Sequence, residues 1–206
     1  INPKHPSFLS MTQEIIRRRD ERNQKMVENF VRENIPMSID APTCGNPDTI
    51  ITRSHFARFL YEHGYVKKRE DAFLHYLDKN GPFYVKRNFF TPKEVIQTIL
   101  DAGGVPVLAH PLLYHLSPEK LDALLAKLTS YGLKGLEVIY TTNTGFDESD
   151  LRKLARIHGL VMTGGSDFHG ANKPKTKIGT GFGNLKIPAD LILPLQSLAQ
   201  NAVSPD

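Results

Sequence analysis

Apolar side chains follow helical spacing through the first part of the chain. Between residues 10 and 34 they recur every three or four positions, which predicts one long helix ended by Pro36. The apolar positions of this helix are Ile15, Ile16, Met26, Phe30 and Val31. Two shorter helices are predicted at 52–63 and 70–77, each followed by a glycine-containing turn. Because the region 31–85 has little strand character, we expect it to form a helical insertion subdomain.

From residue 91 onward, helical stretches alternate with short apolar runs. The runs at 105–110, 135–140 and 160–165 are predicted to be buried strands. Helices are predicted around them at 91–104, 117–132, 147–159 and 188–200. Such alternation predicts an α/β fold with parallel strands wrapped by helices, either a barrel or a doubly wound sheet. In both folds, functional sites lie at the C-terminal ends of the strands.

Composition narrows the class of protein. With 206 residues, 40% hydrophobic and 23% charged, the chain is typical of a soluble globular protein. The formal charge of +4 suits an anionic ligand but is too small to indicate nucleic-acid binding by itself. The single cysteine, Cys44, excludes an internal disulfide and is typical of a reducing compartment. Since no apolar run is long enough to span a membrane, we expect a cytoplasmic location and no membrane partner.

Side chains that can bind metals follow two of the predicted strands. His110 comes at the end of the first apolar run, and the loop GGSDFHG (164–170) places Asp167 and His169 after the third. Imidazole and carboxylate groups are ligands for zinc, manganese and iron, and three converging ligands are the minimum for a hydrolytic metal site. A lone histidine after a strand is often structural. The prediction of a metal site therefore depends on all three residues sharing one edge of the sheet.

A metal site of this kind indicates hydrolysis of phosphate esters. Metal coordination lowers the pKa of water towards ~7, which makes hydroxide available at neutral pH. The sequence contains neither the glycine-rich phosphate loop of a kinase nor the G-x-S-x-G of a serine hydrolase. The glycine-rich GTGFGN at 179–184 is interpreted as a turn.

Two of these motifs resemble a known family. AGGVPVLAHP and GLVMTGGSDFHG resemble the last two metal-binding motifs of the PHP (polymerase and histidinol phosphatase) superfamily. The stretches RSHFARFLYEHGYV and DAFLHYLDKNGPFYV extend the likeness over essentially residues 1–190, towards bacterial members that dephosphorylate nucleoside 3′,5′-bisphosphates or trim RNA from its 5′ end. The resemblance implies a distorted (β/α)7 barrel, formed here by residues 1–30 and 86–206, with the insertion at 31–85.

The resemblance also implies the cofactors. Family members hold two or three divalent metals (manganese, zinc, iron or magnesium), and their late ligands correspond to His110, Asp167 and His169. The family's opening H-x-H, a following Asp, and a further His, Glu and His should precede INPKHPSF, but the sequence does not contain them. We therefore expect a partial barrel without its first strands, and an isolated polypeptide that is weakly active or inactive. His5 follows the position of the missing motifs and is expected to be a surface residue.

Substrate contacts are predicted in the insertion. Arg53, His55 and Arg58 are close in sequence on the helix at 52–63, where they form either a phosphate-binding face or a solvated basic face. Tyr84 and Lys86 resemble the family's return from insertion to barrel, which implies stacking or a phosphate contact.

Three further residues carry open interpretations. Arg19 and Arg22 on the long helix could contact a phosphate or face solvent, and Glu137 is expected to make a structural hydrogen bond, with metal ligation as the alternative. The predicted ligands of the protein are phosphorylated small molecules, nucleotides or short RNA. The alternatives are a histidinol-phosphatase-like or DNA-directed activity, or an inert scaffold or binding fragment.

Overall fold

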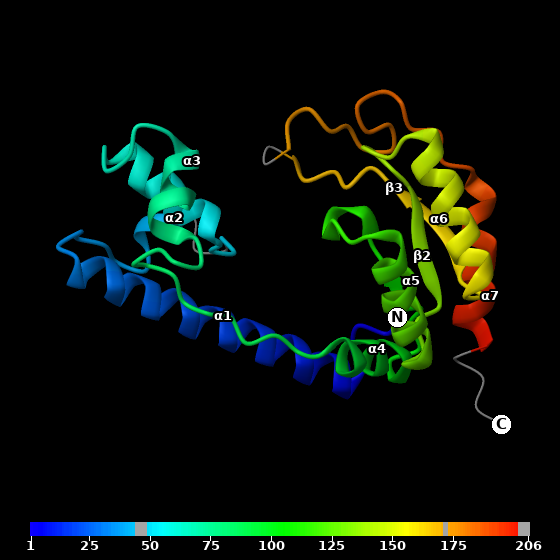
Figure 1. Cartoon of the computed structure of the whole chain (residues 1–206). Coiled ribbons are helices and arrows are strands. Elements are labelled where there is room, and N and C mark those ends of the chain that lie inside the picture. The colour runs from blue at the N-terminus through cyan, green and yellow to red at the C-terminus, as the bar shows by residue number, and fades with distance from the viewer. Residues whose placement is uncertain (44–48, 171–172, 202–206) are drawn as a thin grey trace. The chain divides into compact units, whose positions relative to one another are not determined.

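The computed structural model describes residues 1–43, 49–170 and 173–201, so Cys44 lies outside the described residues. The chain divides into two compact units, which are considered separately (Figure 1). Unit 1 comprises Ile1–Ser10 and Phe90–Asp206, and unit 2 comprises Met11–Phe89. The sequence predicted boundaries after residues 30 and 85. The first unit boundary falls earlier, inside the first helix between Ser10 and Met11, because the later residues of that helix contribute side chains to the core of unit 2; the second boundary falls after Phe89.

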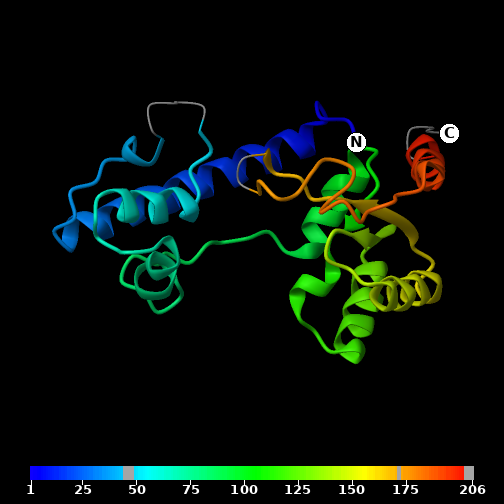
Figure 2. The same ribbon diagram turned by 90° about the horizontal axis from the view of Figure 1, so that it is seen from above.

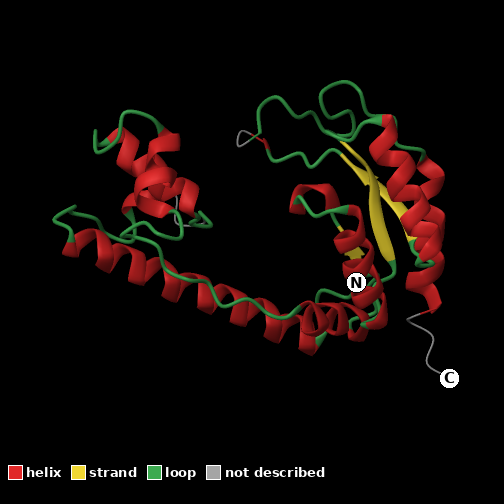
Figure 3. Ribbon diagram, viewed as in Figure 1, coloured by secondary structure: helices red, strands yellow, loops and turns green. Residues whose placement is uncertain are grey.

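Unit 2 is built from helices and loops, without a strand among its described residues (Figure 3). The long helix α1 spans Pro6–Arg32, with its first residues in unit 1, and α2 spans Arg53–Glu62. The predicted helix at 70–77 is a short α-helix, α3 (Arg69–Ala72), continued by a single π-helical turn, η2 (Phe73–Leu77). A short 3-10 helix, η1 (Ala41–Thr43), precedes α2.

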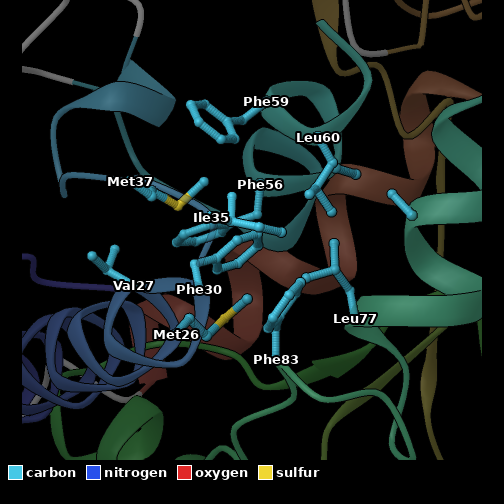
Figure 4. Close-up of a cluster of buried hydrophobic side chains, with 12 residues drawn as sticks. Met26, Val27, Phe30, Ile35, Met37, Phe56, Phe59, Leu60, Leu77 and Phe83 are labelled. Atoms are coloured by element: carbon cyan, nitrogen blue, oxygen red, sulfur yellow. The ribbon is translucent and has the colours of Figure 1, made fainter. Parts of the chain in front are cut away.

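Aromatic side chains make the core of unit 2 (Figure 4). Phe30 of α1 is fully buried and stacks on Phe56 of α2 and on Phe83, with ring centroids 5.7 and 4.0 Å apart. Phe83 follows η2 and also stacks on Tyr76 at 5.4 Å. Stacked aromatic pairs add to the stability that their buried area provides, so these rings hold α1, α2 and the return segment together.

The predicted apolar face of α1 was partly wrong. Ile15, Ile16 and Val31 are exposed, whereas the buried face includes the polar residues Arg22 and Asn23. The Asn23 amide donates to the Ile51 carbonyl oxygen, 3.3 Å away, and so joins the helix to the loop before α2. A core position on this helix is therefore set by what packs against it and not by hydropathy alone.

Unit 1 carries a parallel sheet of three strands in the order β1 (Val107–Leu108), β2 (Gly135–Tyr140) and β3 (Val161–Gly165). Helix α4 (Pro92–Asp101) precedes β1, and α5 (Pro118–Ser130) and α6 (Gly145–Ile157) connect successive strands. The described residues of the unit also form η3 (Pro111–Tyr114), η5 (Ala189–Leu191) and α7 (Ile192–Asn201). The prediction of an α/β fold with parallel strands is confirmed, although β1 is shorter than the apolar run that predicted it.

Helix ends in unit 1 lie where capping residues occur. The Thr91 hydroxyl accepts from the Glu94 N–H while the Glu94 carboxylate accepts from the Thr91 N–H, and Pro92 opens α4. Thr144 and Asp147 form the same reciprocal pair at the start of α6. Each pair satisfies N–H groups that the first helical turn leaves without partners.

The core of unit 1 lies on one face of β2. Leu136 and Val138 are fully buried and pack in one cluster with Leu125 of α5 and Leu151 of α6. Because side chains alternate along a strand, Glu137 faces the opposite side. Residues 173–188, between β3 and η5, form a long irregular segment (Figure 2). None of the helices in the described residues is long and apolar enough to cross a membrane.

Candidate metal site at the strand ends

His110 follows β1 in a backbone conformation that non-glycine residues rarely adopt. Its φ and ψ are 35° and 56°, in the left-handed region, and the 3-10 helix η3 begins at the next residue. The ring lies near the aromatic rings of Tyr114 and Tyr140, with centroids 6.4 and 5.9 Å away. Its Nδ1 atom is buried and has no hydrogen-bond partner in the described part of the chain. A buried ring nitrogen without a partner is available to bind a ligand.

Glu137 of β2 holds the backbone at His110. Its Oε2 atom accepts the His110 backbone N–H at 2.7 Å. Burial raises the pKa of Glu137, although the hydrogen bond from His110 lowers it in part. A Cβ atom at Gly165 on β3 would lie 2.7 Å from Glu137 Oε1, so any larger residue there would require the Glu137 carboxylate to move. The expected structural hydrogen bond of Glu137 is therefore present.

Asp167 lies two residues beyond β3, also in the left-handed region, with φ at 54°. Its carboxylate accepts hydrogen bonds from the buried Tyr140 hydroxyl at 3.0 Å and from the Lys173 ammonium. Burial by itself would raise the pKa of Asp167, but the bonds from Lys173 and Tyr140 lower it below its ordinary value. The same contact and burial raise the pKa of Tyr140 to about 12. Asp167 is thus a carboxylate that is ionised at neutral pH.

His169 turns back towards Asp167. Its Nδ1 atom lies 2.8 Å from the Asp167 carbonyl oxygen and 3.3 Å from Oδ1, and its side chain is half exposed. The structure therefore brings Asp167 and His169 together. His110 is linked to them through Tyr140, whose ring lies near the His110 ring and whose hydroxyl donates to Asp167. Among the described residues, no three histidine, cysteine or acidic side chains converge closely enough to form a metal cluster. Ligation by this trio stays a prediction.

Sequence reasoning did not single out Lys173. It lies six residues after Asp167, and the motif itself carries no signal that a lysine will reach back to the carboxylate. Tyr140 ends the run at 135–140 that was predicted as a strand, but its hydrogen bond to Asp167 depends on the pairing of β2 with β3.

The predicted substrate residues of unit 2 divide into two groups. Arg53 and Tyr84 line a pocket of that unit. His55 instead closes the capping box of α2, where its Nδ1 atom accepts the Thr52 N–H at 3.1 Å. Arg58 donates to the Pro42 carbonyl oxygen at 3.0 Å and lies 3.9 Å from Glu62, and Lys86 is exposed outside the pocket.

Comparison with known proteins identifies the family. A protein from Bifidobacterium adolescentis, described as a metal-dependent phosphoesterase, has a crystal structure that superposes with a TM-score of 0.73. The two chains are 30% identical over 96% of this chain and 68% of the other. This chain belongs to the PHP superfamily of phosphoesterases.

Other PHP relatives point the same way. An amidohydrolase structure from Chromobacterium violaceum, with bound sulfate and no metal, superposes with a TM-score of 0.76 at 28% identity, covering 96% of this chain and 69% of the other. The 5′-3′ exoribonuclease Rnm of Escherichia coli is 32% identical over 82% of this chain and 58% of its own length. The 3′,5′-nucleoside bisphosphate phosphatase of Chromobacterium violaceum is 30% identical over 87% and 63%. The chain thus spans about three fifths of these curated relatives, and no protein-family profile matches it.

The donor set of this PHP chain suits a divalent metal. An ionised carboxylate at Asp167 and imidazoles at His110 and His169 are ligand types that zinc, manganese and iron share. Two observations agree with this. The buried Nδ1 atom of His110 has no hydrogen-bond partner among the described residues, and the Asp167 carboxylate already binds one cation, the Lys173 ammonium.

Proposed function

We propose that the whole protein is a metal-dependent phosphoesterase that hydrolyses phosphate esters of nucleotides or RNA ends. The observation that carries the proposal is the buried Nδ1 atom of His110, which has no hydrogen-bond partner among the described residues and lies at the same sheet edge as the ionised Asp167. The names of the relatives support the substrate class, because they act on nucleoside bisphosphates or RNA. The proposed reaction is metal-assisted hydrolysis in the cytoplasm.

The metal ligands of this chain would be His110, Asp167 and His169. Two or three divalent ions, of manganese, zinc, iron or magnesium, would supply Lewis acidity and an activated water when bound. Residues around the three ligands would hold them in position for the metal ions. Glu137 fixes the backbone of His110, and Tyr140 holds the carboxylate of Asp167 in one orientation. The Lys173 ammonium balances the Asp167 charge and would give way, or turn to a phosphate oxygen, when a metal binds there.

The rest of the proposed architecture follows the family. The three parallel strands would be part of a (β/α)7 barrel formed by residues 1–30 and 86–206, with residues 31–85 as its insertion. Of the substrate contacts, Arg53 and Tyr84 are supported by the pocket that they line. His55, Arg58 and Lys86 stay as candidates, although the first two already make structural contacts.

Metal content of the purified chain tests the ligand assignment. We expect bound metal in the wild-type chain and its loss in His110→Ala and Asp167→Ala. His75→Ala is the matched control, since His75 is an exposed histidine of unit 2. A wild-type chain that binds no metal, or a His110→Ala variant that binds as much as His75→Ala, would contradict the assignment. Because the isolated chain is expected to be weakly active or inactive, phosphate release from adenosine 3′,5′-bisphosphate by the metal-loaded whole protein then tests the substrate class.

A further inference from the structure

The chain after β3 forms a small hairpin in unit 1, within residues 173–184, which we call the hairpin segment. Two residues of it pair across a tight turn. The Lys177 N–H donates to the Gly181 carbonyl oxygen at 2.8 Å, and the Gly181 N–H donates to the Lys177 carbonyl oxygen at 3.0 Å. Gly179 and Gly181 have φ angles of 73° and 59°, a region that glycine adopts without strain. The sequence of the turn therefore suits its conformation.

Contacts with the ends of β2 and β3 fix the hairpin segment in place. The Ser166 hydroxyl accepts the Gly179 N–H at 3.3 Å, and the Asn184 amide donates to the Thr141 carbonyl oxygen at 3.1 Å. The Thr141 hydroxyl in turn donates to the Ser166 carbonyl oxygen at 2.7 Å. Gly181 passes so close to Thr141 that a Cβ atom there would lie 2.7 Å from its Oγ1 atom. The sheet thus holds this segment from several sides.

The side chains that the hairpin segment turns to solvent are basic and apolar. Lys175 and Lys177 are exposed, and neither forms an ion pair with a carboxylate among the described residues. Ile178 is 76% exposed and Phe182 is 59% exposed. The sequence contains no aspartate or glutamate from residue 168 to residue 188. Apolar groups exposed together, beside cations without a counter-charge, are typical of an interaction surface.

A pocket of about 360 Å³ joins this surface to the candidate metal site. Lys175 and Phe182 line it on the side of the hairpin segment. Tyr140 and Lys173 line it as well, and both hydrogen-bond to the Asp167 carboxylate. None of the described residues that line the pocket is acidic. An anionic ligand in this pocket would therefore lie next to the proposed metal ligand.

The arrangement of these side chains favours a polymer over a single nucleotide. Lysine ammonium groups bind phosphates of either, and an exposed ring stacks on a base of any identity. Lys177 and Ile178, however, lie outside the pocket. A nucleotide that fills the pocket would leave both unused, whereas the following residues of a strand would reach them. Stacking on an exposed ring also requires an unpaired base, which a single strand supplies and a duplex does not.

We propose that the hairpin segment binds a single-stranded RNA chain, with one base on Phe182 in the pocket and backbone phosphates on Lys175 and Lys177. The proposal rests on the proposed function, because it makes an RNA strand the substrate of the same site. It involves none of the proposed metal ligands and none of the candidate substrate contacts of unit 2.

Binding of a fluorescent ten-nucleotide oligouridylate to the full chain in EDTA tests the proposal without hydrolysis. The double substitution Lys175→Ala, Lys177→Ala should weaken binding about ten-fold at low salt. It should also reduce the slope of log affinity against log salt concentration by about 1.4, at about 0.7 for each phosphate contact of a single strand. The matched control is Lys127→Ala with Lys134→Ala, two exposed lysines at the end of α5 and before β2, beside the opposite edge of the sheet.

The contribution of the ring is tested separately from that of the charges. Phe182→Ala should weaken oligouridylate binding about five-fold or more, and Phe182→Tyr, which keeps a ring, should bind as wild type does. A ten-residue oligoglutamate carries charge without bases and should not displace the RNA. Because Phe182 and both lysines are exposed, all of these variants should melt at the wild-type temperature.

The outcomes separate this proposal from the proposed hydrolysis. The proposal is overturned if the wild-type chain does not bind oligouridylate, if both lysine pairs weaken binding equally, or if oligoglutamate competes as well as RNA does. Any of these results, together with phosphate release from adenosine 3′,5′-bisphosphate by the whole protein, would leave the hydrolysis in place. Loss of RNA binding in the hairpin variants, with no phosphate release by the whole protein, would instead support the RNA surface and contradict the hydrolysis.

Discussion

The hydrogen bond from His110 to Glu137 gives a prediction whose size can be worked from the structure. The left-handed backbone of His110 costs roughly 1–2 kcal/mol relative to an ordinary conformation. A hydrogen bond to a charged acceptor contributes about 1.5–3 kcal/mol, so the 2.7 Å bond to Glu137 is sufficient to offset this strain. Glu137→Leu removes the acceptor and leaves the strain and an unpaired N–H.

We expect Glu137→Leu to lower the free energy of unfolding by about 1–3 kcal/mol, less whatever the buried carboxylate itself costs. Metal affinity should fall about 10–100-fold, as it does when residues that hydrogen-bond to metal-binding side chains are replaced. Glu137→Gln keeps an acceptor of nearly the same shape and should recover a large part of both losses. This recovery separates a positioning role from simple loss of packing.

Urea unfolding followed by circular dichroism, with metal content measured on the same samples, checks both effects. The reasoning is refuted if Glu137→Leu unfolds at the wild-type urea concentration and holds as much metal as the wild-type chain. It is also refuted if Glu137→Gln and Glu137→Leu are equally impaired, because the hydrogen bond would then not be the cause.

Three further substitutions test separate parts of the structure. Gly165→Ala places a Cβ atom 2.7 Å from Glu137 Oε1 and should reduce metal content, whereas Gly145→Ala meets nothing within 4 Å and should leave it unchanged. Phe30→Ala should destabilise unit 2 by about 3–5 kcal/mol in thermal unfolding, without changing metal content, since its ring is fully buried between two others. Thr144→Ala removes the cap of α6 and should cost about 1 kcal/mol in urea unfolding. Wild-type stability in either of the last two variants would contradict the packing or the cap described above.

Local signals predicted the elements of unit 1 well. The run at 135–140 is β2 with the same bounds, and α4 begins at Pro92, one residue after the predicted start at 91. These elements carry their own start and stop signals, so little tertiary information is needed. The run at 105–110 forms only the two-residue β1, because strand length depends on pairing, and β1 pairs with β2 alone in the described residues.

Tertiary contacts limited the prediction elsewhere. Ile15 is exposed and Arg22 is buried on the same helix, so hydropathy alone did not predict which residues of α1 pack against the rest of unit 2. At the strand ends, the sequence indicated His110 and Asp167 through their positions after apolar runs. The sequence could not indicate that the Lys173 ammonium contacts the Asp167 carboxylate, because six residues of loop are compatible with many backbone conformations.

The candidate metal site and the pocket of unit 2 share a physical feature, which is that both break local rules of stability. In the described residues, only four non-glycine positions have a positive φ, and two of them are His110 and Asp167. Strained backbone persists only where surrounding contacts over-determine it, as Glu137 and Tyr140 do here. Unit 2 breaks a different rule by burying the charge of Arg22 among other arginines. Strained backbone and a buried, unpaired charge both lower stability. In both units they occur beside polar groups that can bind a ligand, so we attribute them to binding and not to folding.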